Sequence, residues 1–113
     1  MDTFKQLLET YREYWCDCRS LQWMRDSAPE GLQGEIDRKR QAAEDALRET
    51  AEQIAEAMAC LSSTEKQILQ LRYMELLPGG RLRRWEDIAG LVGYSVPHVL
   101  RLHRQAMRRI ENR

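Results

Sequence analysis

The sequence predicts an all-α protein in which a long antiparallel helical hairpin precedes a domain of three shorter helices. Three observations support this fold class. Apolar residues recur at steps of three and four through most of the chain. Only 6 Gly and 3 Pro occur in 113 residues, and most of them separate the periodic segments. Apolar residues make up 42% and charged residues 32% of the chain, which is typical of a folded helical protein and unlike a disordered or collagen-like one.

The first predicted helix carries most of the aromatic residues of the chain. Asp2 or Thr3 can cap it, since both side chains accept a hydrogen bond from a free backbone N–H. Apolar residues then follow at helical spacing from Phe4 to Leu21, and we expect the helix to run to about Arg25.

A second helix completes the predicted hairpin. The segment 27–34 holds one proline and two glycines and is expected to reverse the chain. From Glu35 to about Cys60 the helical stripe is thin and rich in alanine, which lets the aromatic first helix approach closely. Residues 1–60 therefore form a hairpin that has too little core of its own, and we expect it to pack on the rest of the chain, on a second copy or on another protein.

The third helix has clear start and stop signals. Ser62 and Glu65 have the spacing of a capping box. Apolar residues between 68 and 77 nearly surround the helix, which suits a helix clasped between neighbours. Pro78-Gly79-Gly80 is expected to end it, and a basic connection, 81–84, leads onward.

The last third of the chain has the spacing of a helix-turn-helix. This motif needs a small residue where two helices cross, a residue that tolerates positive φ in the turn, and an apolar plug from the second helix. Ala89, Gly93 and Val99 supply these in order. Ser95 is placed to cap the second helix, with Pro97 in its first turn. Residues 61–113 are therefore the predicted helix-turn-helix domain.

The second helix of this motif, from Val96 to about Asn112, is the candidate recognition helix. Its inward stripe is predicted to be Val99, Leu102, Ala106 and Ile110, which leaves a row of cations outside. The N-terminal residues of such a helix reach base edges and later ones meet phosphates. The predicted base contacts are Ser95, Val96, His98, Leu100 and Arg101. The predicted phosphate contacts are Arg104 and Arg108 together with Arg81, Arg83 and Arg84 in the connection. For His98, a surface histidine without a role is an equal alternative.

Charge is divided unequally along the chain although the formal net charge is zero. Residues 1–60 carry 8 Lys/Arg and 13 Asp/Glu, a net charge of −5, and residues 61–113 carry 10 and 5, a net charge of +5. This split favours contact between the C-terminal half and a nucleic acid or another acidic surface.

Other classes of function find little support. The three cysteines, Cys16, Cys18 and Cys60, lack the spacing of a disulfide framework or a metal site, so we expect neither a metal nor a cofactor. No nucleophile, base and orienting group occur together, so we expect no enzyme. No segment is long and apolar enough to cross a membrane and the N-terminus is unlike a signal peptide, which favours the cytoplasm.

Three stretches, 61–73, 85–99 and 104–110, together resemble region four of bacterial sigma factors. They match its Leu-x-x-x-Glu-x-x-Ile-Leu-x-Leu-Arg-Tyr helix, its Glu-Ile-Ala helix with a Gly-x-Ser turn, and the end of its recognition helix. The resemblance implies binding to promoter DNA near the −35 element and contact with the RNA polymerase flap. Two features depart from the family: the connection 78–84 is longer than usual, and Trp85 stands where a capping Thr is common.

The sequence therefore favours a sequence-specific DNA-binding transcriptional regulator. Nothing in it resembles the sigma region that melts the −10 element, so it is more similar to the small sigma-like regulators of phages and integrated mobile elements than to a complete initiation factor. The predicted partners are double-stranded DNA, RNA polymerase and a second copy bound through the hairpin. The alternative is a protein-interaction module that binds RNA polymerase or a sigma factor without reading DNA.

Overall fold

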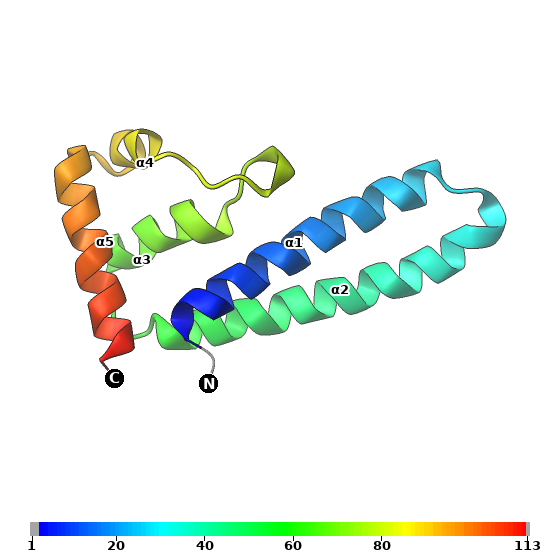
Figure 1. Ribbon diagram of the computed structural model, residues 1–113, viewed down its shortest axis with the longest axis horizontal. Helices are drawn as coiled ribbons and strands as arrows, with labels where there is room; N and C mark the ends of the chain where they lie inside the picture. The colour runs from blue at the N-terminus through cyan, green and yellow to red at the C-terminus, as the bar shows by residue number, and fades with distance from the viewer. Residues whose placement is uncertain (1–2, 113) are drawn as a thin grey trace.

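The computed structural model describes residues 3–112 and confirms the all-α class (Figure 1). A long hairpin projects from a compact group of shorter helices at one end of a molecule 52 Å long. The elements are α1 (Phe4–Ser27), α2 (Glu30–Ala57), α3 (Ser63–Leu69), a π-helical turn η1 (Gln70–Met74), a 3₁₀ turn η2 (Pro78–Gly80), α4 (Trp85–Val92) and α5 (Val96–Glu111).

The helix α1 begins as predicted. The Thr3 side chain accepts a hydrogen bond from the Gln6 backbone N–H, and the Gln6 side chain accepts one from the Thr3 N–H, which makes a complete capping box. Asp2, the other predicted cap, lies outside the described residues.

The chain reverses over far fewer residues than the predicted turn 27–34. Only Ala28 and Pro29 separate the two helices, and α2 begins at Glu30 instead of Glu35. Pro29 serves as the N-cap because its fixed φ suits the extended backbone before a helix. The two glycines thus lie inside the first turns of α2, at a cost of up to about 1 kcal/mol each relative to alanine.

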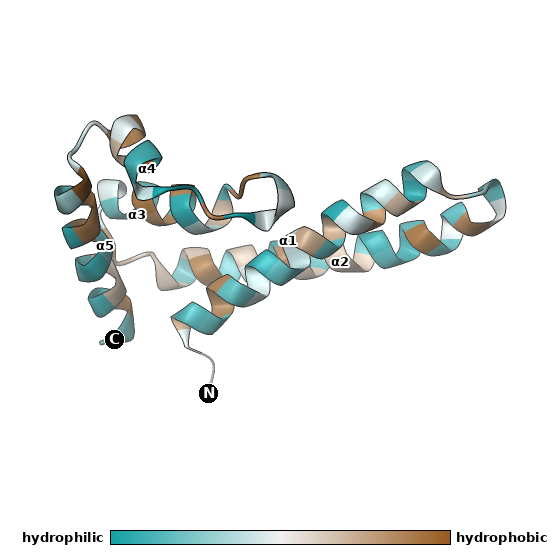
Figure 2. Ribbon diagram, turned by 45° about the horizontal axis from the view of Figure 1, so that its top comes forward, coloured by the Kyte–Doolittle hydropathy of each residue, from teal (hydrophilic) through white to brown (hydrophobic). Residues whose placement is uncertain are grey.

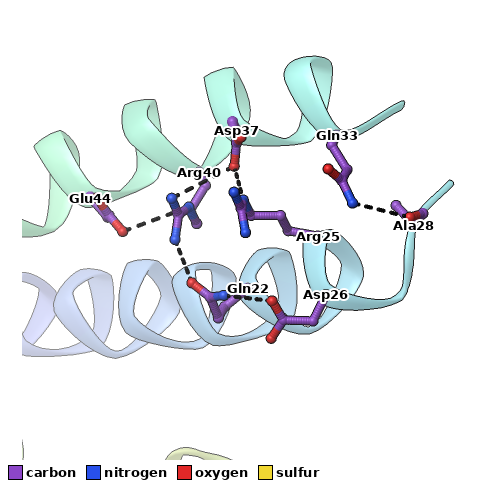
Figure 3. A network of polar contacts seen from close by, with 8 residues as sticks. All are labelled: Gln22, Arg25, Asp26, Ala28, Gln33, Asp37, Arg40 and Glu44. Atoms are coloured by element: carbon purple, nitrogen blue, oxygen red, sulfur yellow. Dashed lines mark hydrogen bonds and ion pairs between the residues drawn. The ribbon is translucent and has the colours of Figure 1, made fainter. Parts of the chain in front are cut away.

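Polar contacts fix the register of the two helices near the reversal (Figure 3). Arg25 forms an ion pair with Asp37, and Arg40 donates a hydrogen bond to Gln22 across the hairpin. Closer to the base, burial raises the pKa of the Cys18 thiol, and the Glu44 carboxylate of α2 raises it further. Every step along α1 is therefore matched by an equal step back along α2.

The third helix starts as predicted and ends earlier. Ser62 and Glu65 form a capping box. After Leu69 the helix widens into the π-helical turn and stops at Met74, four residues before Pro78. The Met74 carbonyl oxygen, at the end of that turn, accepts a hydrogen bond of 3.3 Å from the Tyr11 hydroxyl of α1. The sequence pattern did not indicate this widening.

One hydrophobic cluster joins the base of the hairpin to the C-terminal helices. The hairpin supplies Phe4, Leu8 and Ile54, and the rest of the chain supplies Met58, Leu61, Leu69, Ala106, Met107 and Ile110. Residues on both sides of the predicted boundary between 60 and 61 are therefore buried together. The helix α2 ends at Ala57 and not near Cys60, and its C-cap Met58 is buried in this cluster.

A second cluster holds the helix-turn-helix together. Ile68 and Leu71 of the third helix pack with Ile88 and Ala89 of α4 and Val99 of α5. Ile88 and Val99 are completely buried. Ala89 and Val99 thus take the inward positions that the sequence predicted for them.

An ion pair between a buried carboxylate and a half-exposed arginine ties the start of α3 to the end of α5. The Glu65 side chain is 2% exposed, and its Oε1 accepts a hydrogen bond of 2.8 Å from the Arg109 guanidinium. Its Oε2 is buried without a partner, so this carboxylate already lacks part of its solvation.

We predict that Arg109→Ala lowers the free energy of unfolding by about 1–3 kcal/mol, because it leaves a buried carboxylate without its cation. The neighbouring Arg108→Ala, at an exposed position, should change it by no more than about 0.5 kcal/mol. Urea unfolding followed by circular dichroism measures the free energy of unfolding of both variants. Equal decreases in the two variants would contradict a stabilising role for the ion pair between Glu65 and Arg109.

Candidate nucleic-acid interface

The helix α5 presents an apolar side to the core and a cationic side to solvent. Val99, Ala106 and Ile110 of the predicted inward stripe are buried, and Leu102 is half-buried against the second cluster. Met107, which is not part of the predicted stripe, is buried as well. Figure 2 shows hydrophilic segments along the outer side of α5.

The entry to α5 has the geometry that the sequence predicted. Gly93 ends α4 with φ 79° and ψ 25°, a left-handed conformation that favours glycine. The Ser95 side chain accepts a hydrogen bond from the His98 backbone N–H, and Pro97 lies in the first turn. The start of α5 is thus fixed firmly relative to α4.

The five predicted base contacts differ in accessibility. Ser95 and Arg101 are exposed. His98 is half-buried, and its ring lies edge-on to Tyr94 with the ring centroids 4.6 Å apart. Val96 packs against the second cluster, and Leu100 is also half-buried. The structure therefore leaves Arg101 as the most accessible long side chain of this set.

Tyr94 is a candidate that sequence reasoning missed. It is 44% exposed at the turn, next to the His98 ring, and its hydroxyl can donate a hydrogen bond to a phosphate. An aromatic residue between the turn glycine and the cap is the signal that could have pointed to it.

The two predicted phosphate contacts within α5, Arg104 and Arg108, are exposed and lie on one wall of a groove between α5 and α1. The groove has a volume of about 490 Å³. Lys5 and Arg12 of α1 line its other wall, although no DNA contact was predicted for the hairpin. Their spacing of seven residues, which puts two cations on one helix face, was the available signal.

The basic connection before α4 is held by contacts from two directions. Arg72 of η1 donates a hydrogen bond to the Arg83 carbonyl oxygen, and its guanidinium lies 4.3 Å from the centroid of the Trp85 ring. From the other side, Arg12 of α1 donates a hydrogen bond of 2.6 Å to the Gly80 carbonyl oxygen. The unusually long connection therefore has a defined path.

Within this connection the three predicted phosphate contacts are not equally free. Arg81 is exposed. Arg84 is exposed too, and its hydrogen bond to Asp87 raises its guanidinium pKa, which is already high. Arg83 is half-buried, with a buried Nε that has no partner. The N-cap of α4 is Arg84 and not Trp85, which is the first residue of the helix, and Arg84 forms no side-chain cap.

His103 is half-buried and packs toward η1 and α4. Its Nε2 is 2.8 Å from the Tyr73 hydroxyl oxygen, and its ring lies edge-on to Trp85 at 4.8 Å. Burial, followed by the charges of Arg72, Arg104 and Lys5, lowers the pKa of His103 to about 4. The ring is therefore neutral near pH 7 and joins η1, α4 and α5.

The described residues contain no group of three His, Cys, Asp or Glu side chains arranged to hold a metal ion. Over the same range, no helix is long and apolar enough to cross a membrane. Cys16, Cys18 and Cys60 are free thiols.

Comparison with known protein families gives one match. Residues 57–112 match the family described as Sigma-70, region 4, whose members are DNA-binding, non-enzymatic domains. The match spans the end of α2, the helix-turn-helix and the whole of α5. Comparison with curated proteins and with solved structures gives no match.

We predict that the free energy of unfolding falls as the pH drops from about 6.5 to 4. In the unfolded chain His103 has its ordinary pKa of about 6.5, whereas in the folded protein its pKa is about 4. Between these two pH values the unfolded chain binds a proton at His103 and the folded protein does not. The neutral His103 ring therefore contributes fully to the free energy of unfolding above pH 6.5, and this contribution is lost as the pH falls toward 4. Since the ring is partly solvated, the loss should be on the order of 1 kcal/mol.

His103→Gln keeps a polar partner for Tyr73 and removes this titration. Urea unfolding at several pH values should show a weaker pH dependence for the variant than for the original protein. The same slope in both proteins would mean that other groups cause the acid destabilisation.

Proposed function

Residues 57–112 are a sigma-70 region-4-like helix-turn-helix domain, and we propose that the protein is a sequence-specific transcriptional regulator that inserts α5 into the major groove of DNA. The observation that carries this proposal is the row of exposed cations, Arg101, Arg104 and Arg108, opposite the buried stripe of α5. A helix that is fixed on one side and cationic on the other meets the requirements of a recognition helix.

The candidate residues then fall into two groups, those that contact bases and those that contact phosphates. Arg101 lies in the second turn of α5 and reaches the edge of a guanine. Ser95, Val96, His98 and Leu100 lie around it at the start of the helix, and of these Ser95 is the best exposed. Arg104, Arg108, Arg81, Arg83 and Arg84 contact phosphates and set the orientation of the domain.

In this proposal the two parts of the chain have different binding functions. Residues 61–113 bind DNA, and residues 1–60 bind a partner protein, either RNA polymerase or a second copy of the chain. The formal net charge of zero and pI of 6.7 support this division, because such a protein has little nonspecific attraction for DNA and gains from a partner. We place the protein in the cytoplasm and, on the sequence resemblance, among phage or mobile-element regulators. A terminase or integrase gene beside it would support that origin.

A second candidate function is a protein-interaction module that binds RNA polymerase or a sigma factor without reading DNA. The groove between α1 and α5 favours it, because Leu8 and Met107 line the groove as well as the cations. Glu9 and Glu111 line the groove too, but the cations outnumber them. Such a surface suits an acidic protein segment as well as a phosphate backbone.

Two substitutions on α5 separate these functions. Arg101→Ala should weaken binding to the preferred site by about 1–3 kcal/mol and reduce the preference among sites. Arg108→Ala, about two turns further along, should weaken binding to all sequences alike and lower the slope of log affinity against log salt by about one. Both side chains are exposed, so both variants should fold.

Binding to a pool of randomised DNA duplexes at two salt concentrations measures these effects. Arg48→Ala is a suitable control, since it removes an exposed arginine from the hairpin, away from α5. If Arg101→Ala and Arg108→Ala changed DNA affinity and sequence preference equally, α5 would bind DNA only by nonspecific charge attraction. Unchanged DNA binding together with lost polymerase binding would favour the interaction module.

A further inference from the structure

The groove between α1 and α5 lies between the two sets of residues for which phosphate contacts are predicted. Arg104 and Arg108 of α5 line one wall, and the basic connection borders the groove through Leu82. Arg12 of α1 also lines the groove, and it donates a hydrogen bond of 2.6 Å to the Gly80 carbonyl oxygen, next to the start of the connection. A polyanion that contacts both sets therefore passes over the groove.

The hydrophobic cluster at the base of the hairpin holds the two walls of the groove together. Phe4 and Leu8 of α1 are buried in this cluster with Met107 and Ile110 of α5. In Figure 1 the first turns of α1 lie beside the C-terminal half of α5. Cations on the first turns of α1 therefore keep a fixed position relative to α5 before any ligand binds, which lowers the entropic cost of binding.

The cations of the groove are not neutralised by the protein. There are four of them, Lys5 and Arg12 on α1 and Arg104 and Arg108 on α5. Every ion pair printed by the described residues 3–112 uses other cations, although Glu9 and Glu111 line the same groove. Four cations and two carboxylates leave an excess of two positive charges. The groove is therefore prepared for an anion.

The charges of the two walls act on the same point inside the groove. His103 lines the groove, and its pKa is lowered by burial, then by Arg72, and then by Arg104 of α5 and Lys5 of α1. The positive potentials of the two helices thus overlap at this ring. An anion in the groove is attracted by both helices at once.

We propose that the sugar-phosphate backbone of the DNA duplex read by α5 runs along this groove, where Lys5 and Arg12 contact it. The inference rests on the proposed DNA binding and adds the first three turns of α1 to the interface. Lys5 and Arg12 are seven residues, or about 10 Å, apart along α1, so they reach different phosphates of one strand. The rest of the hairpin stays available to a protein partner.

Two observations favour a phosphate backbone over an acidic protein segment. The groove is continuous with the exposed row of α5, because Arg104 and Arg108 belong to both and Arg101 extends the row. The apolar side chains in the groove, Leu8 and Met107, are only 6% and 8% exposed. They offer little of the apolar surface whose burial drives most protein association. Phosphates need only accessible cations.

The test is DNA binding by the full chain at several salt concentrations, with the duplex selected from the randomised pool. Lys5→Gln should weaken binding about fivefold at 0.15 M salt, and by less at higher salt, because one released counterion is lost. The slope of log affinity against log salt should fall by about one. The preference among sites should not change, since phosphate contacts carry no sequence information. Lys5 is exposed, so the variant should fold, and circular dichroism checks this.

Two further positions sharpen the test. Arg12→Gln should weaken binding as Lys5→Gln does, and Arg12→Lys, which keeps the charge, should retain most of the affinity. Equal losses in the two Arg12 variants would mean that Arg12 acts through its hydrogen bond to Gly80, and would overturn its phosphate contact. Glu9→Gln removes a carboxylate from the groove and should strengthen binding about two- to threefold.

A matched control is Lys39→Gln, which removes the same charge from an exposed position of α2 outside the groove. Its affinity and salt slope should stay nearly unchanged. A loss equal to that of Lys5→Gln would mean that only long-range attraction acts, and would overturn the contact.

The outcomes separate this inference from the proposed function. If Lys5→Gln binds DNA as the original protein does while Arg104→Gln binds it more weakly, the backbone runs elsewhere, and only this inference is wrong. If substitutions at Arg101, Arg104 and Arg108 have no effect either, the proposed DNA binding is wrong as well. Unchanged DNA binding by Lys5→Gln together with lost binding to RNA polymerase would overturn the inference and assign the groove to an acidic protein segment.

Discussion

The fold depends on one shared hydrophobic cluster at the base of the hairpin. Ile54 of α2, Leu69 of α3 and Ala106 of α5 are almost or completely buried there, and Phe4 and Leu8 of α1 close it from the side. The hairpin supplies Phe4, Leu8 and Ile54 and the rest of the chain supplies the other buried residues, so neither part completes this cluster alone. Because the cluster includes the inward stripe of α5, the same burial that stabilises the molecule also orients the candidate recognition helix.

Polar contacts then restrict α5 to one orientation. The ion pair between Glu65 and Arg109 fixes its C-terminal end, and the His103 ring, held by Tyr73 and Trp85, fixes its middle. The Ser95 cap fixes its start. These contacts occupy the sides of α5 that face the protein, so the remaining side is free for the exposed arginines. A surface prepared in this way loses little conformational entropy when it binds.

The sequence predicted the helices and the turn well because their signals are local. Caps such as Ser62 and Ser95, and the left-handed Gly93, act on the next three residues and need no tertiary context. The reversal at Pro29, the π-helical turn and the position of His103 were missed. The π-helical turn and the position of His103 depend on contacts between distant parts of the chain, as Tyr11 with Met74 and His103 with Tyr73 show. The reversal was placed too late because the two glycines of α2 were taken as helix-breaking residues. In the candidate interface, helical periodicity located Arg101, Arg104 and Arg108. It could not show that Lys5 and Arg12 lie across a groove from them, because that neighbourhood exists only after the hairpin folds back.

The projecting hairpin gives the molecule a mechanical property. Its free end stands at the far end of a body 52 Å long, whereas its attachment to α5 is a patch of a few side chains, with Phe4 and Leu8 on one side and Met107 and Ile110 on the other. A sideways force at the tip therefore acts through a long moment arm, and the contacts at the short pivot must supply opposing forces larger than the force applied. Any protein that grips the tip of the hairpin also exerts torque on the helix that carries the arginines.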